Sequence, residues 1–189
     1  MSEQTIHYPV LPLIAQRWSP RTFIPEAIPE ELVNSMFEAA RWTPSSYNAQ
    51  PWRYLYTHHE DQESFQALLQ CLNPPNQQWA QHAGLLIACI AETGNADRTH
   101  LNRHAYYDLG AANFALTLQA LEFGIYVRQM GGFNQDHARS ILQLPLHQDP
   151  VVFLAAGYPQ DANVQQHTKA RKSQQHWAQA FKANGRREV

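Results

Sequence analysis

The chain has 189 residues, of which 44% are hydrophobic and 16% charged, and 14 basic against 16 acidic side chains give a formal net charge of −2. This composition excludes a disordered chain and predicts one globular domain over residues 1–189. The balanced charge gives no sign of the strongly basic surface that binding to nucleic acid or to an anionic membrane requires, so a small-molecule partner fits better.

The first residues and the cysteines bear on the location of the protein. The segment "MSEQTIHYPV" has no charged start followed by an apolar core, and no apolar run reaches the ~18 residues needed to span a bilayer. Cys71 and Cys89 lie in apolar surroundings, which predicts buried free thiols in a reducing compartment. We therefore expect a cytoplasmic protein without membrane contact.

In the N-terminal half, helical and extended patterns are separated by prolines. The apolar stripe that begins after Pro29 predicts a helix that stops near Trp42, because Pro44 disfavours helical geometry at Thr43. The segment "NPPN" is expected to break the chain before a short helical piece. The other predicted elements are a short helix at 10–16, a strand at 52–57, a helix at 61–72, the helical piece at 76–82 and a buried strand at 83–92.

The second half begins with a long segment, residues 104–123, that is apolar on most sides and has Gly124 as its C-terminal stop. A helix with so little polar surface is buried, often against a second subunit. A strand at 125–130, a helix at 133–144 with Asn134 as N-cap, and a strand at 150–157 follow. Helices and strands alternate without a regular βαβ repeat, which predicts a layered mixed sheet.

Two motifs in the N-terminal half gather hydrogen-bonding side chains. In "RWSPR", Arg17 and Arg21 offer planar sets of donors suited to phosphate oxygens, and Ser19 adds a short donor between them. A solvated basic turn is the alternative interpretation.

The second motif, "TPSSYNAQPW", carries Ser45, Ser46 and Asn48 on a backbone stiffened by Pro44. Such a loop can present fixed polar groups to the edge of a planar ring. The same groups could instead satisfy the end of the preceding helix and the next turn, and the residues alone leave both interpretations open.

The later motifs are less specific. Gly131 and Gly132 in "RQMGGFN" allow close backbone approach to a ligand, or form a plain turn. The basic segment "KARK", residues 169–172, is a candidate functional cluster, and the alternative is a solvated charged stretch. His100 and His104 could share a helix face, but no third ligand has the spacing of a known zinc motif, so no metal site is predicted. Hydrolase and nucleotidase motifs do not occur.

Taken in order, the segments "RWSPRTF", "PSSYNAQPW", "NQQWA", "YYDLGAANFALTLQALEFGI", "GGF", "LQLP" and "PVVFLAAGYP" resemble the FMN-dependent nitroreductase family, from about residue 17 to residue 177. The resemblance implies an α+β, nitroreductase-like three-layer fold with a central, mostly antiparallel sheet flanked by helices. It also implies an intertwined homodimer with FMN at the interface. The C-terminal tail, from about residue 160, would pack on the partner subunit.

Matching the family's motifs residue by residue implies a set of FMN contacts. The 17–21 segment and the C-terminal basic residues would hold the phosphate and the pyrimidine edge, where an amide at Asn76 would also lie. Residues 44–48 would reach the flavin from the partner subunit. The implied cofactor-binding residues are Arg17, Trp18, Ser19, Arg21, Pro44, Ser45, Ser46, Asn48, Asn76, Gly131, Gly132, Lys169 and Arg171.

Two positions depart from the family pattern. Trp18 stands where Arg or His is common, so only a backbone or stacking role is implied there. Gly131 stands where some members carry Glu, which leaves its backbone N–H near flavin N5 as the implied contact. No catalytic side chain is implied beyond the flavin itself.

The resemblance implies an oxidoreductase that transfers hydride from NADH or NADPH through flavin N5 to a nitroaromatic, quinone, activated alkene or related small electrophile. The mechanism would be ping-pong, and Arg21 beside flavin N1 would stabilise the negative charge of the reduced ring. Three alternatives keep the fold: a reductive dehalogenase, a flavin-fragmenting enzyme and a non-catalytic FMN-binding protein. The sequence contains no Rossmann acidic residue that would separate NADH from NADPH.

Overall fold

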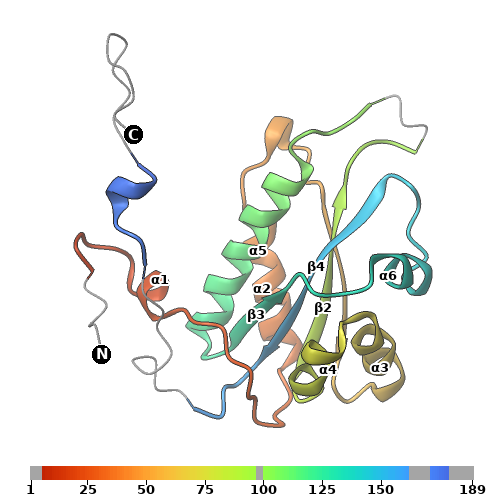
Figure 1. The fold of residues 1–189 in the computed structure, drawn as a ribbon, viewed down its shortest axis with the longest axis horizontal. Coiled ribbons are helices and arrows are strands. Elements are labelled where there is room, and N and C mark those ends of the chain that lie inside the picture. Colours follow the sequence, from red (N-terminus) through yellow and green to blue (C-terminus); the bar gives the residue numbers. More distant parts are fainter. Residues whose placement is uncertain (1–5, 97–99, 162–170, 179–189) are drawn as a thin grey trace.

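The computed structural model describes residues 6–96, 100–161 and 171–178, which form an α+β fold with a four-stranded antiparallel sheet between two layers of helices (Figure 1). The sheet order is β1-β2-β4-β3, so β1 and β3 are the edge strands. The strands are β1 (Trp52–His58), β2 (Leu85–Glu92), β3 (Tyr126–Met130) and β4 (Gln148–Gly157). The predicted fold class is confirmed.

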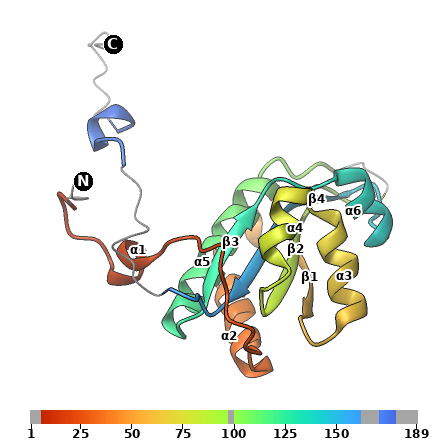
Figure 2. The same ribbon diagram turned by 60° about the horizontal axis from the view of Figure 1, so that its bottom comes forward.

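Helices cover both faces of the sheet (Figures 1 and 2). On one face lie α2 (Glu30–Arg41) and α5 (Ala105–Glu122). On the other lie α3 (Gln62–Cys71), α4 (Pro74–Ala80) and α6 (Gln135–Ile141). Three short pieces complete the described elements: α1 (Pro12–Gln16) and the 3-10 helices η1 (Ser46–Asn48) and η2 (Gln174–His176). Within the described ranges, no helix has both the length and the apolar character of a transmembrane segment.

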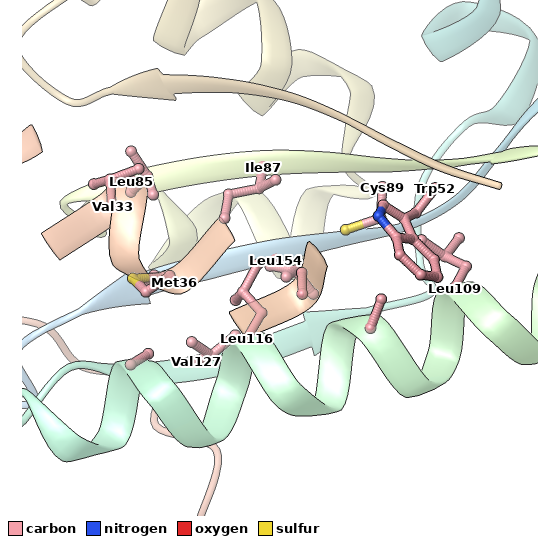
Figure 3. Close-up of a cluster of buried hydrophobic side chains, with 14 of the residues drawn as sticks. Val33, Met36, Trp52, Leu85, Ile87, Cys89, Leu109, Leu116, Val127 and Leu154 are labelled. Carbon is pink, nitrogen blue, oxygen red and sulfur yellow. The ribbon is translucent and has the colours of Figure 1, made fainter. Parts of the chain in front are cut away.

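The larger core lies between the sheet and the helices α2 and α5 (Figure 3). Met36 from α2 and Leu116 from α5 meet Leu154 of β4 there, and all three side chains are buried. Strand β2 is apolar throughout because its side chains point alternately into this core and into the second core under α3 and α6. The continuous apolar run that predicts a buried central strand is therefore confirmed, and Cys71 and Cys89 are buried free thiols as predicted.

The helix ends follow local chemistry. Gly124 takes a left-handed φ of 71° directly after the C-cap of α5, which only glycine adopts without steric cost. Asn134 caps α6 by accepting a hydrogen bond from the His137 N–H at 3.0 Å. Both predictions are confirmed.

The segment "NPPN" separates two helices, as predicted: α3 ends at Cys71, and Leu72 and Asn73 are extended. The predicted start of the next helix is wrong, because Pro74 and Pro75 occupy the first turn of α4, which begins earlier than predicted. Proline is tolerated at this position because the backbone N–H groups of a first turn have no helical partner to lose. The same residue type that ends one helix therefore starts the next.

Two terminal segments project from the body of the molecule. The segment containing α1 and the segment containing η2 lie side by side, away from the sheet (Figures 1 and 2). Helix α1 buries none of its residues, and the large apolar side chains of Leu11, Ile14 and Trp177 are exposed. These two segments are therefore not packed into the core of their own chain.

Candidate functional site

The segment after α1 is fastened to the edge strand β3. Arg17 Nη1 donates a hydrogen bond to Ser19 Oγ at 3.2 Å, and Arg128 Nη1 of β3 donates to the Ser19 carbonyl oxygen at 2.7 Å. The Trp18 ring packs against the ring of Tyr126 at a centroid distance of 5.6 Å. Ser19 thus brings two guanidinium groups together.

Four arginines form a positively charged group, which we call the arginine cluster: Arg17, Arg21, Arg128 and Arg171. Burial, and after it the charge of Arg171, lowers the pKa of the Arg17 guanidinium. Burial, and after it the charge of Arg21, lowers the pKa of Arg128. The ion pairs formed among the described residues include none of the four. An anion bound here would relieve this like-charge repulsion.

The arginine cluster adjoins helix α4 and the loop after β3 that contains Gly131 and Gly132, which we call the glycine loop. The Arg128 guanidinium lies 5.2 Å from the centroid of the Trp79 ring on α4. On the same helix, Asn76 Nδ2 donates to the Gly132 carbonyl oxygen at 3.0 Å, and the backbone N–H of Asn73 donates to that oxygen at 3.0 Å. Strand β3, its following loop and α4 therefore converge beside the cluster.

The two glycines of this loop differ in their surroundings. A Cβ added to Gly132 would lie 2.9 Å from Asn76 Nδ2 and 3.3 Å from Asn73 Nδ2, so the backbone approaches α4 too closely for a side chain. Gly131 is exposed, and a Cβ there would meet nothing within 4 Å. Gly132 is thus needed for local packing, whereas the Gly131 backbone is accessible to a ligand.

A second group of candidate residues lies in the loop around η1. The Ser46 N–H donates to the buried carboxylate of Asp108 at 3.1 Å, and the Gln50 N–H donates to Ser45 Oγ at 3.0 Å. Asp108 stands in the first turn of α5, where the helix dipole favours negative charge. The local interpretation of the loop is therefore confirmed for Ser45, whose hydroxyl oxygen accepts within the loop while its O–H can still donate.

The same loop has an unusual backbone. Tyr47, Asn48 and Gln50 have φ values of 53°, 54° and 47°, in the left-handed region. Asn tolerates this region, but Tyr and Gln adopt it at a cost, so the bonds to Asp108 and Ser45 hold a strained conformation in place. The strained turn leaves the side chains of Tyr47 and Asn48 exposed.

The two groups are attached to α5 at different places. The η1 loop is bonded to its first turn, while β3 begins shortly after its C-terminal end. The first group holds Arg17, Ser19, Arg21, Asn76, Gly131, Gly132 and Arg171, and the second holds Pro44, Ser45, Ser46 and Asn48. Trp18 adjoins the first group with a buried side chain. Lys169 lies outside the described residues.

Sequence reasoning misses two residues of this arrangement. Arg128 is a charged residue in a short strand that leads directly into the glycine loop. Its place just before that loop is the sequence signal that could have identified it as a site residue. Asp108 is a carboxylate in the first turn of a largely apolar helix, and it must find a polar partner when it is buried. Neither residue reveals from the sequence which distant segment it contacts.

Comparison with known proteins gives one family. The model described as "Nitroreductase family" matches residues 14–158, whereas no curated protein matches the chain. A structure described as an oxidoreductase containing FMN has 29% identity and a TM-score of 0.87, with 98% of this chain and 99% of that chain covered.

Two further solved structures have lower identity. An FMN-dependent nitroreductase from Clostridium difficile has 20% identity and a TM-score of 0.68, with 87% of this chain and 92% of that chain covered. A nitroreductase family protein from Streptococcus pneumoniae has 17% identity and a TM-score of 0.75, with 89% and 98% covered. At this identity the two structures demonstrate a shared fold.

The two glycines allow a matched test of the loop. In the protein without added ligand, Gly132→Ala should lower the free energy of unfolding by about 1 kcal/mol, because the new methyl group displaces the Asn76 amide from its hydrogen bond. Gly131→Ala should change it by less than about 0.5 kcal/mol, since the site is open. Urea unfolding followed by circular dichroism measures both values, and equal effects of the two substitutions would contradict this packing.

Proposed function

The chain belongs to the nitroreductase family, and we propose that it is a homodimeric oxidoreductase that binds FMN and passes electrons from NADH or NADPH to a small electrophile. Nitroaromatics, quinones and activated alkenes are the acceptor classes. The arginine cluster beside the glycine loop is the observation that carries the proposal. A phosphate monoester has a charge of about −1.5 to −2 at neutral pH and matches such a cluster.

FMN fits the donors that the first group offers. Arg17, Ser19 and Arg171 would hold its phosphate, with Lys169 as a further cation. Guanidinium groups bind phosphate oxygens through paired hydrogen bonds, which fix orientation as well as charge. The partly buried position of Arg17 strengthens such a contact, because water screens it less.

The remaining residues of this group would contact the ring. Arg21 and Asn76 would hold its pyrimidine edge, and the accessible N–H of Gly131 would approach N5. When bound, FMN supplies the two-electron carrier between nicotinamide and acceptor, so the chain needs no nucleophile or metal of its own. Arg21 and Arg128 place positive charge where reduction creates negative charge.

A second copy of the chain would complete the site. Ser45, Ser46 and Asn48, with Pro44, share no hydrogen bond with the arginine cluster among the described residues of their own chain, and we assign them to the FMN of the partner subunit. The donor and the acceptor would occupy this shared site in turn, which gives ping-pong kinetics.

Exposed apolar side chains support the dimer. Tyr106, Tyr107 and Phe114 leave a second face of α5 apolar and exposed, and the projecting terminal segments carry Leu11 and Trp177. Contiguous apolar surface of this kind is typical of a protein interface. We propose that residues 1–189 form one domain whose tail, from about residue 160, packs on the partner.

The assignment of the phosphate end predicts an effect on affinity. Arg17→Ala should weaken FMN binding by about tenfold to a hundredfold, because a hydrogen bond to a charged group contributes about 1.5–3 kcal/mol. Arg41→Ala is the matched control, since Arg41 is exposed and paired with Glu38. Titration of flavin fluorescence measures both affinities, and an unchanged affinity of the Arg17 variant would refute the role.

The proposed reaction predicts a spectroscopic change. Under anaerobic conditions, NADH or NADPH should bleach the visible flavin absorbance of the FMN-loaded protein, and a nitroaromatic or quinone should restore it. Stopped-flow mixing in two stages follows both half-reactions. A protein that takes up no FMN, or whose bound flavin neither nicotinamide reduces, would show the proposed function to be wrong.

A further inference from the structure

A pocket of about 600 Å³ lies between the η1 loop and the start of α5. Its volume is in the range of small-molecule sites. Ser46 and Tyr47 line one side, and residues 100–104 line the other. The pocket thus adjoins the loop that is assigned to the flavin, but it contains none of the residues of the arginine cluster.

The segment between β2 and α5 is folded back on itself to form the second wall. Gly94 and Leu101 form a β-bridge, and the Asn102 N–H donates to the Thr93 carbonyl oxygen at 2.8 Å. The His100 N–H donates to the side-chain oxygen of Asn95 at 2.9 Å. These bonds fix the backbone of residues 100–104, which precede α5 and line the pocket.

Among the described lining residues of the pocket, positive charge remains after ion pairing. Its lining contains one acidic residue, Glu92, whose charge is neutralised in an ion pair with Arg53. Arg103 also lines the pocket, and no ion pair within the described part of the chain includes it. His100 and His104 each add a ring N–H donor, even in the neutral form.

The pocket also has apolar surface. The Tyr47 side chain is fully exposed, and the Leu101 side chain is largely exposed, so both are available to a ligand. Arg103, which pairs with no carboxylate among the described residues, together with two imidazoles and apolar walls suits an organic anion with an aromatic body.

We propose that this pocket binds the anionic group of an enzyme substrate, with Arg103 as the counter-charge and His100 and His104 as hydrogen-bond donors. The proposal rests on the proposed function, because that function places the flavin beside Ser46. A carboxylate on an aromatic acceptor and the 2′-phosphate of NADPH share the required chemistry. Either would make Arg103 a specificity-determining residue.

Equilibrium binding tests the pocket without turnover. The full-length, FMN-loaded protein is titrated calorimetrically with two matched pairs of probes: benzoate against benzamide, and adenosine 2′-monophosphate against adenosine. The wild type should prefer the anion of at least one pair, and Arg103→Gln should reduce that preference by about tenfold. Arg41→Gln removes the same charge outside the pocket and should leave the preference intact.

The results separate the two sources of the anion. Loss of preference for benzoate identifies an acceptor carboxylate, and loss of preference for adenosine 2′-monophosphate identifies the donor phosphate. A wild type that prefers neither anion, or an Arg103 variant that keeps the preference, overturns the proposal.

Turnover distinguishes a failure of this proposal from a failure of the proposed function. With the neutral acceptor 4-nitrobenzamide and NADH, the wild type and the Arg41→Gln control should have similar kcat/KM values. A general loss of this activity in Arg103→Gln would indicate a structural role and would overturn the selective one. A wild type that is inactive with all acceptors would contradict the proposed function, whereas the binding preference is measured independently.

Discussion

The first half of the site is arranged around the partly buried positive charges of Arg17 and Arg128. Burial lowers the pKa of both guanidinium groups, and a second arginine adds like-charge repulsion to each, Arg171 to Arg17 and Arg21 to Arg128. Ser19 accepts hydrogen bonds from two of these side chains, and the Trp79 ring faces the Arg128 guanidinium. These contacts position the cations but do not neutralise them. Because guanidinium groups do not lose their protons in proteins, the repulsion can be relieved by an anion and not by titration.

The sheet and α5 hold the arginine cluster and the η1 loop in fixed positions within one chain. Leu116 and its neighbours on α5 pack against the sheet, where Val127 of β3 lies beside them (Figure 3). The first turn of the same helix is bonded to the η1 loop. The bond from Ser46 to buried Asp108 fixes the strained loop to this rigid element. In the proposed dimer, a flavin bound at the arginine cluster would meet the η1 loop of a second chain, and that contact would account for the strain and the exposed side chains of the single chain.

Local patterns in the sequence predict the elements better than the contacts between them. The burial of β2 and the ends set by Gly124 and Asn134 follow from nearest neighbours along the chain. The partners of Arg128 and Asp108 lie 109 and 62 residues away, and periodicity carries no information about such pairs. The grouping of the candidate site residues follows from the family resemblance, whereas the contacts that attach each group to β3, α4 or α5 become visible only in the folded chain.

The central claim is that one FMN site takes Arg17 from one chain and Asn48 from its partner. Arg17→Ala and Asn48→Gly subunits, mixed into heterodimers, test it directly, since glycine removes the Asn48 side chain without strain at its φ of 54°. Each homodimer should bind FMN weakly at both sites. The heterodimer should regain one site of wild-type affinity, because Arg17 of one subunit and Asn48 of the other then meet in the same site. A heterodimer with two weak sites would contradict the claim.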